Sequence, residues 1–173
     1  MQITQETPTA ADVRALLDEH LTDMFATSPP ESVHALDLAA LTAPHVTFLT
    51  ARTGDGRLLG CGALSELAAT TPGGAGHGEL KSMRTAPAAR GRGVATAVLD
   101  RLLDLAAGRG YARVSLETGS QDYFAAARRL YTRRGFVACE PFGSYTEDPH
   151  SVFMTLAPVT VAAARDSVEA TAF

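Results

Sequence analysis

Hydrophobic residues in the first part of the chain recur at helical spacing. Apolar side chains stand every three or four positions from 13 to 25, and the Ser-Pro-Pro at 28–30 ends the pattern, which predicts an amphipathic helix. Thr9 and Asp12 have the spacing of a capping box at the start of this helix. Similar spacing over 31–41 predicts a second, shorter helix.

The next part of the chain has the pattern of strands. Segments 46–52 and 57–67 flank a Gly-Asp-Gly turn, which predicts a hairpin. Segment 70–78 contains four glycines and a proline and predicts a flexible loop. A third strand is predicted over 79–85, and residues 1–4 are long enough for an edge strand.

The rest of the chain alternates helices with strands. A helix over 93–107 precedes a strand over 111–118, and a helix over 122–134 precedes strands over 136–139 and 151–156. The predicted order is β-α-α-β-β-β-α-β-α-β-β without an internal repeat. This order places the chain in the α/β (α+β) class.

The composition is that of one globular domain. The 173 residues include 46% hydrophobic and 20% charged residues, and the net charge of −4 gives no overall positive field for nucleic acid. We expect one domain over 1–157 and a C-terminal tail over 158–173, for which a helix is one option. The five histidines lack metal-ligand spacing, so we predict no metal.

The same sequence predicts a cytoplasmic protein. No apolar run reaches the ~20 residues of a membrane span, and residues 1–9 lack the pattern of a signal peptide. Cys61 and Cys139 lie far apart and predict two reduced thiols. We therefore expect neither a membrane nor a nucleic acid as partner.

Segment 79–95 carries the most informative chemistry. A predicted strand leads through a loop into a helix, and residues 90–93, Arg-Gly-Arg-Gly, stand at the junction. Helix N-termini present unpaired N–H groups with partial positive charge, and glycine lets a ligand approach the backbone closely. Arginine adds charge-assisted contacts. The segment therefore predicts a pyrophosphate site.

Two other phosphate-binding loops fit this segment less well. A P-loop requires Gly-Lys-Ser/Thr, which is absent here. A dinucleotide-binding loop requires Gly-x-Gly-x-x-Gly directly after an apolar strand, but Thr96 replaces the third glycine, the loop over 85–91 is long, and the strand over 79–85 is polar. Glu117 still stands about where a ribose-binding acid is expected, so a nicotinamide-dependent oxidoreductase stays open on these residues alone.

Two motifs resemble those of the GNAT superfamily of N-acetyltransferases. Residues 90–95, RGRGVA, resemble motif A, with Pro87 ahead of it, and residues 130–136, LYTRRGF, resemble motif B. The resemblance covers about 46–156, and the segment PFGSYTEDPHSVFM is similar to a branch of small bacterial members. It implies a GNAT-like mixed, mostly antiparallel sheet of six to seven strands, with helices on both faces and a V-shaped splay between the two central strands.

The resemblance implies acetyl-CoA as co-substrate. The strand before motif A then carries a bulge, and the backbone of Met83, Arg84 and Thr85 pairs with the pantetheine arm. The Met83 N–H holds the thioester oxygen. Phe124 stands where many relatives carry an asparagine that contacts pantetheine. The implied pyrophosphate site consists of Arg90, Gly91, Arg92, Gly93, Val94, Ala95 and Thr96.

The resemblance also implies direct attack of a primary amine on the thioester. Tyr131 matches the acid that protonates the leaving thiolate, and its alternative role is a half-buried packing residue. Glu79 matches the base, and its alternatives are an ion pair with Lys81 or replacement by a water relay. Glu117 and Glu66 are further candidate bases.

The acceptor is implied to be a small molecule that the sequence does not identify. Glu31 and His34 lie on the predicted N-terminal helices that often cover the acceptor site in this superfamily, and Tyr145 lies in the loop before the last strand. A homodimer is also a superfamily expectation. The alternative function is a CoA-binding sensor or interaction module without catalysis.

Overall fold

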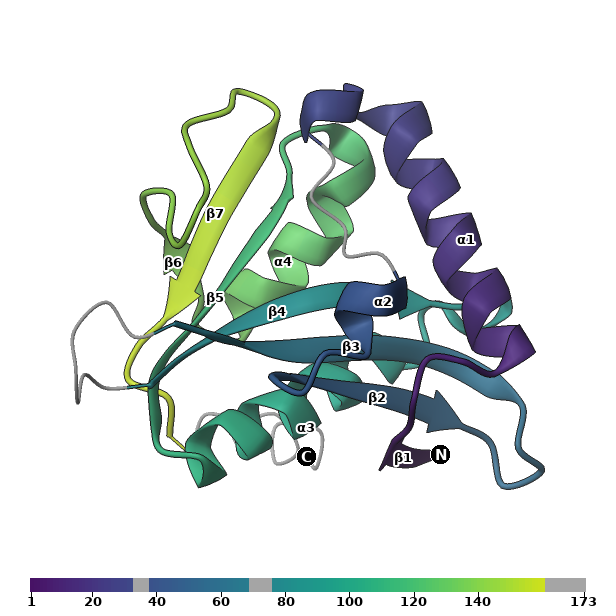
Figure 1. Cartoon of the computed structure of the whole chain (residues 1–173). Helices are drawn as coiled ribbons and strands as arrows, with labels where there is room; N and C mark the ends of the chain where they lie inside the picture. The colour runs from purple at the N-terminus through teal and green to yellow at the C-terminus, as the bar shows by residue number, and fades with distance from the viewer. Residues whose placement is uncertain (33–37, 69–75, 161–173) are drawn as a thin grey trace, which may run out of the picture.

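The computed structural model describes residues 1–32, 38–68 and 76–160, and within them the centre of the molecule is a seven-stranded sheet (Figure 1). The strands lie in the order β1-β2-β3-β4-β5-β7-β6. Neighbouring strands are antiparallel except for β4 and β5, which are parallel. The mixed, mostly antiparallel sheet is therefore confirmed. The strands are β1 (Gln2–Gln5), β2 (Val46–Arg52), β3 (Leu58–Leu67), β4 (Gly76–Thr85), β5 (Tyr111–Gly119), β6 (Val137–Ala138) and β7 (Ser151–Leu156).

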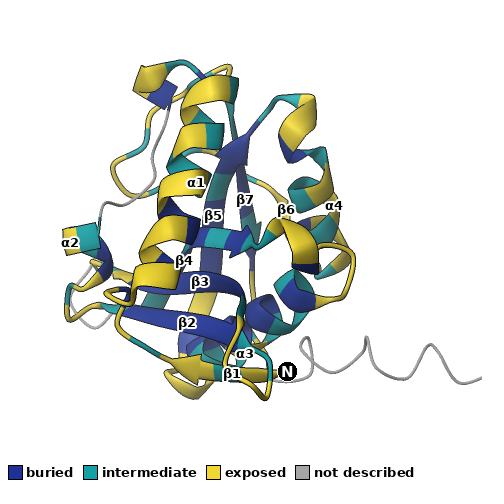
Figure 2. Ribbon diagram, turned by 90° about the vertical axis from the view of Figure 1, so that its right-hand side faces the viewer, coloured by how far each residue is buried: buried dark blue, intermediate teal, exposed yellow. Residues whose placement is uncertain are grey.

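Helices cover both faces of this sheet, as predicted (Figure 1, Figure 2). One face carries α1 (Ala11–Thr27) and α2 (Leu38–Leu41), and the other carries α3 (Val94–Gly108) and α4 (Ala125–Arg133). Three short 3₁₀ turns connect elements of the described chain: η1 (Pro30–Ser32), η2 (Pro87–Ala89) and η3 (Asp122–Phe124).

Each face of the sheet has its own hydrophobic core. Leu99 and Leu102 of α3 are fully buried against Val114 of β5. On the other face, Val13 of α1 packs with Phe48 of β2. A fully buried leucine or valine contributes about 1.5–3 kcal/mol, so these two layers hold the helices in fixed positions around the sheet.

The two central strands separate along their length. Strand β4 pairs with β5 only from Gly76 to Leu80, and the last pair joins Leu80 to Leu116. Beyond that pair β4 continues to Thr85 beside β3, while β5 continues to Gly119 beside β7 (Figure 1). We call the separated region the splay. It confirms the predicted V shape and leaves backbone groups of β4 without a strand partner on that side.

Strand β4 begins three residues earlier than the predicted start at 79. A Cβ at Gly78 would lie 2.8 Å from a ring carbon of Tyr111, so glycine here makes room for an aromatic ring rather than forming a loop. The prediction of a loop over 70–78 is therefore wrong for 76–78, and its remaining residues lie outside the described ranges.

Other predicted boundaries also shift. In place of one helix over 31–41, the described residues show η1 and the short α2, while 33–37 lie outside the described ranges. The predicted helix 122–134 starts with the 3₁₀ turn η3, and the strand predicted over 136–139 keeps only Val137 and Ala138. Such ends depend on packing that local spacing does not contain.

The predicted capping box is wrong. Helix α1 follows Ala10, which provides no side-chain cap, so Thr9 is not the capping residue. The Asp12 carboxylate instead accepts a hydrogen bond of 2.6 Å from Arg52 on β2, which also binds Glu6. This long-range ion pair holds the pKa of Asp12 below its usual value. The Asp12 carboxylate, which the capping box would have used, therefore binds Arg52 instead.

No helix in the described ranges is both long and apolar enough to cross a membrane. Of the predicted tail over 158–173, the structure describes residues 158–160. Within them the Val159 N–H donates to the Ala112 carbonyl at 3.3 Å, so the chain runs beside β5 after β7 ends.

Candidate active site

A bulge in β4 shifts the alternation of side chains between the two faces of the sheet. Ser82 and Met83 together stand opposite Gly62 of β3, and Ser82 has a φ of +51°, in the left-handed region that serine seldom adopts. Ser82 lines a cavity on the α1 side, whereas Met83 packs against the core beneath α3. The bulge follows Leu80 and therefore lies within the splay.

The turn before α3 presents its backbone to open space. Gly91 and Gly93 have φ values of +73° and +76°, and a Cβ at either position would meet no described atom within 4 Å. Val94 is buried and fixes the first turn of α3 on the core, while Arg90 and Arg92 are exposed on either side of Gly91. The first N–H groups of α3 lack partners within the helix. This glycine turn, residues 90–93, can therefore hold a diphosphate.

Close packing at β3 brings the glycine turn and the bulge together. A Cβ at Gly60 would lie 2.7 Å from the Arg84 carbonyl oxygen and 2.9 Å from a methyl of Val94. The Ala86 N–H donates to the Leu59 carbonyl at 2.9 Å, which holds the chain against β3 after β4 ends. Glycine at 60 thus permits the start of α3 to pack beside the splay.

Glu79 belongs to a buried cluster with Lys81 and Tyr145, which we call the Glu79 cluster. Its carboxylate, in a residue only 5% exposed, lies 2.9 Å from the Lys81 ammonium and accepts a hydrogen bond of 2.6 Å from the Tyr145 hydroxyl. Lys81 also donates to that hydroxyl. Burial and the Glu79 charge raise the pKa of Tyr145. The structure therefore joins the predicted base to the predicted acceptor residue and also forms the ion pair with Lys81.

Tyr131 lies on the other face of the sheet, in the core beneath α3 and α4. Its side chain is buried and packs against the Phe136 ring, with centroids 5.8 Å apart. Burial, and then the charge of Glu117, raise the pKa of Tyr131, so the phenol keeps its proton at neutral pH. A protonated phenol at this position can donate a proton.

Glu117 is close to both tyrosines. It is the residue after the last pair of β5 with β4, and it accepts a hydrogen bond of 2.7 Å from the Ser151 hydroxyl. Its charge contributes to the raised pKa values of Tyr131 and Tyr145. Glu117 is therefore the charged group that acts on Tyr131 and also on Tyr145 of the Glu79 cluster.

Arg84 connects three elements around the splay. Its guanidinium forms an ion pair of 2.6 Å with Asp23 of α1, a second with Glu19, and a hydrogen bond of 3.0 Å to the Tyr123 hydroxyl of η3. Tyr123 in turn donates to Asp23 at 2.8 Å. The Arg84 side chain is 6% exposed, so it is held toward α1 and only its backbone is free to face a ligand in the splay.

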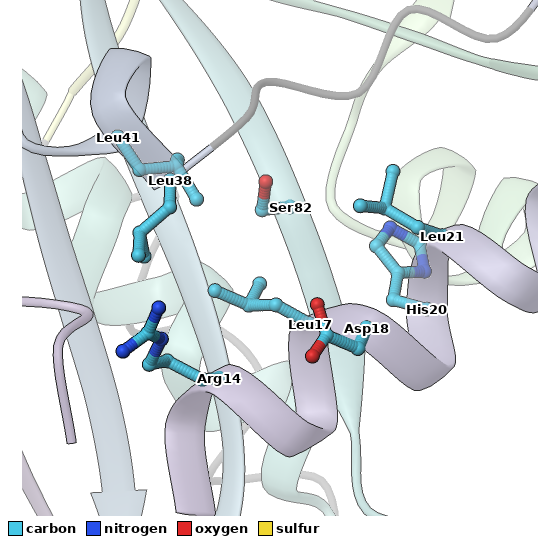
Figure 3. A pocket seen from close by; sticks show the side chains of 8 residues that line it. All are labelled: Arg14, Leu17, Asp18, His20, Leu21, Leu38, Leu41 and Ser82. Atoms are coloured by element: carbon cyan, nitrogen blue, oxygen red, sulfur yellow. The ribbon is translucent and has the colours of Figure 1, made fainter. Parts of the chain in front are cut away.

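A cavity of about 150 Å³ lies between α1, α2 and the bulge of β4 (Figure 3). We call it the α1 cavity. His20 is largely buried there, and its Nδ1 has no hydrogen-bond partner among the described residues. Burial and the nearby charge of Arg84 lower the pKa of His20 to about 4, so this ring is neutral at pH 7. The lining residues are Arg14, Leu17, Asp18, His20, Leu21, Leu38, Leu41 and Ser82.

The remaining acceptor predictions do not meet at this cavity. Glu31 is exposed on η1 and does not line it, and His34 lies outside the described residues. Among the described residues, no group of three or more His, Cys, Asp or Glu is arranged to hold a metal ion.

Sequence reasoning missed the cavity for a specific reason. Leu17 and Leu21 had the spacing of a buried stripe, and Arg14 and Asp18 share that face of α1 at helical intervals. This spacing shows which face of α1 meets the sheet but not where the packing leaves a space. The sequence also did not predict Ser82 as a lining residue, because a bulge is defined by the register of β4 against β3.

Comparisons with known proteins agree with this geometry. The model of the acetyltransferase (GNAT) family matches residues 13–136. The chain is 50% identical over 155 residues to the uncharacterized N-acetyltransferase YsnE of Bacillus subtilis, covering 90% of this chain and 98% of that protein. It is 42% identical over 138 residues to the IAA acetyltransferase of Azospirillum brasilense, covering 80% and 83%.

A solved structure supports the same assignment. The protein comes from Klebsiella pneumoniae and is named as an acyl-CoA N-acyltransferase. Its structure matches with a TM-score of 0.73 and 31% sequence identity, and the match covers 92% of this chain and 97% of that chain. These matches decide against the nicotinamide-dependent alternative and support an acyltransferase. The chain belongs to the GNAT acetyltransferase family.

Proposed function

We propose that this enzyme transfers an acetyl group from acetyl-CoA to the primary amine of a small molecule by direct attack. The observation that carries the proposal is the splay beyond Leu80, which has the bulge at Ser82 and Met83 on its β4 side and the glycine turn nearby. Unpaired strand backbone suits an extended amide chain, and a helix N-terminus suits a diphosphate. Acetyl-CoA contains both groups.

The proposed cofactor site uses mainly backbone. The pantetheine amides pair with Met83, Arg84 and Thr85 as an added strand would, and Arg84 takes part through its backbone because its side chain is bound to α1. The diphosphate lies against the N–H groups of residues 91–96, with Arg90 and Arg92 adding positive charge. The open space beside Gly91 and Gly93 leaves room for phosphate oxygens at the backbone.

The proposed reaction forms an N–C bond and breaks the C–S bond of the thioester. The Met83 N–H stabilises the negative charge that develops on the thioester oxygen. Glu79 accepts the proton that the attacking amine loses, and Tyr131 supplies a proton to the departing thiolate. Lys81 and Tyr145 orient the Glu79 carboxylate.

Two measurements test this function. Saturation with acetyl-CoA at ~100 times its dissociation constant adds about 2.7 kcal/mol of stability, which corresponds to a rise of roughly 5–10 °C in Tm for a domain of this size. Release of free thiol is then followed with a panel of amines, and IAA is included because one relative is named for it. Binding without thiol release from any compound would support a sensor, and absence of binding would refute the cofactor assignment.

The remaining features follow from the same proposal. We expect a cytoplasmic enzyme whose partners are acetyl-CoA, a small amine and, if it assembles, a second copy of the chain. We expect no resident metal. The Glu79→Gln variant keeps the shape of the Glu79 cluster but removes both the proton acceptor and the ion pair with Lys81, whereas Lys81→Met removes the ion pair alone. A much larger loss of kcat in Glu79→Gln than in Lys81→Met would therefore assign the proton acceptor to Glu79.

A further inference from the structure

We propose that the α1 cavity binds a compact apolar group of the acceptor, so that the acceptor is an apolar monoamine such as an amino acid with a branched aliphatic side chain. This inference rests on the proposed function, because it describes the acceptor of the same reaction. It selects among amino acids, polyamines and antibiotics, which the motifs leave equally open.

The position of the cavity links it to the chemistry. Ser82 forms part of its wall, and the next residue, Met83, carries the N–H proposed to hold the thioester oxygen. Because Ser82 and Met83 are adjacent in the chain, a group in the cavity lies one residue away from the thioester site. An amine attached to that group can therefore approach the thioester from the α1 side.

The size and lining of the cavity define the group. Its volume of about 150 Å³ is comparable to that of an engineered apolar cavity that binds benzene. Four leucines form its apolar wall, and Leu17, Leu38 and Leu41 also belong to the core beneath α1 (Figure 3). An isobutyl or single-ring group fits such a space.

The charges around the cavity argue against a polyamine. Arg14 and Asp18 put one positive and one negative charge on its exposed rim, and His20 is neutral at pH 7. The neighbouring acids Glu19 and Asp23 are paired with Arg84. A second ammonium group would therefore meet a single acid at the rim, Asp18, whose charge is offset by Arg14 on the same rim.

L-leucine and L-asparagine provide a matched pair of probes, because their side chains have similar shape and differ in polarity. We expect kcat/KM for L-leucine to exceed that for L-asparagine by about 10- to 100-fold, since only the isobutyl group gains from burial against leucines. The Leu21→Trp variant fills the cavity and should lower kcat/KM for L-leucine at least tenfold while changing that for glycine less than twofold. Ala15→Trp adds the same bulk on the exposed side of α1 and should change neither.

A binding measurement separates this inference from the proposed function. Addition of L-leucine to the CoA-bound enzyme should shift the NMR signals of the His20 ring, and L-asparagine should not. A shift with L-leucine but no thiol release from any amine would support the cavity and refute the transferase reaction. Three results would overturn the cavity assignment. The first is thiol release from other amines while the His20 signals stay unmoved, and the second is an equal kcat/KM for L-leucine and L-asparagine. The third is an equal loss of kcat/KM for L-leucine and glycine in Leu21→Trp. Absence of both thiol release and His20 shifts would overturn it as well.

Discussion

Arg84 allows a quantitative test of how the splay is held in place. Its side chain is 6% exposed, whereas those of its partners Glu19 and Asp23 are 44% and 36% exposed. Removal of both acids leaves a buried guanidinium without a counter-charge, which costs about 3–5 kcal/mol. Removal of the guanidinium leaves two acids that water can solvate. The loss in free energy of unfolding is then about 1–2 kcal/mol, the value of a partly screened, charge-assisted contact.

The structure therefore predicts an asymmetry between two variants. In urea unfolding, Glu19→Ala/Asp23→Ala should lose at least about 1 kcal/mol more free energy of unfolding than Arg84→Met, given the two ranges above. Asp18→Ala removes an acid from the same helix that has no ion pair in the described ranges, and it should change stability by less than about 0.5 kcal/mol. Equal losses for the two main variants would show that Arg84 is solvated and does not tie α1 to β4.

Three further predictions concern the cavity, the acid and the glycine turn. The folded pKa of His20, about 4, lies below its unfolded value of about 6.5. The free energy of unfolding of the wild type, relative to that of His20→Gln, should therefore fall by about 2 kcal/mol between pH 7 and pH 5 in urea unfolding. A difference that stays constant with pH would contradict the burial of this ring. Tyr131→Phe should lower kcat about 10²- to 10⁴-fold with acetyl-CoA affinity changed less than twofold by calorimetry, and an unchanged kcat would remove Tyr131 as the acid. Gly93→Val, which puts a β-branched residue at a φ of +76°, should weaken acetyl-CoA binding at least about tenfold, whereas Gly54→Ala, where a Cβ meets no described atom within 4 Å, should bind normally.

The sequence was most informative where function depends on consecutive residues. The glycine turn and the motif around Tyr131 are read directly from the chain, because a left-handed turn needs glycine and a helix N-terminus is a local feature. The alternation of helical and strand spacing likewise predicted the order of elements in the described ranges, since each element buries one face.

Features that depend on the register between strands could not be predicted from the sequence. Gly76 and Gly78 look like loop residues until the Tyr111 ring is placed over them. Ser82 looks like an ordinary strand residue until two residues of β4 oppose one of β3. Arg84 was predicted near the cofactor, but its side chain is bound by acids more than sixty positions away in the chain. In each case, tertiary contacts determine what the residue does.

Residue-resolved amide hydrogen exchange, with and without saturating acetyl-CoA, tests the central claim most directly. If the carrier lies in the splay with its diphosphate at the glycine turn, exchange should slow at residues 83–85 and 91–96, and the exposed hairpin turn between β2 and β3 should be unchanged. Binding of acetyl-CoA that leaves these two segments unprotected, or that protects only α1 and α2, would contradict the account.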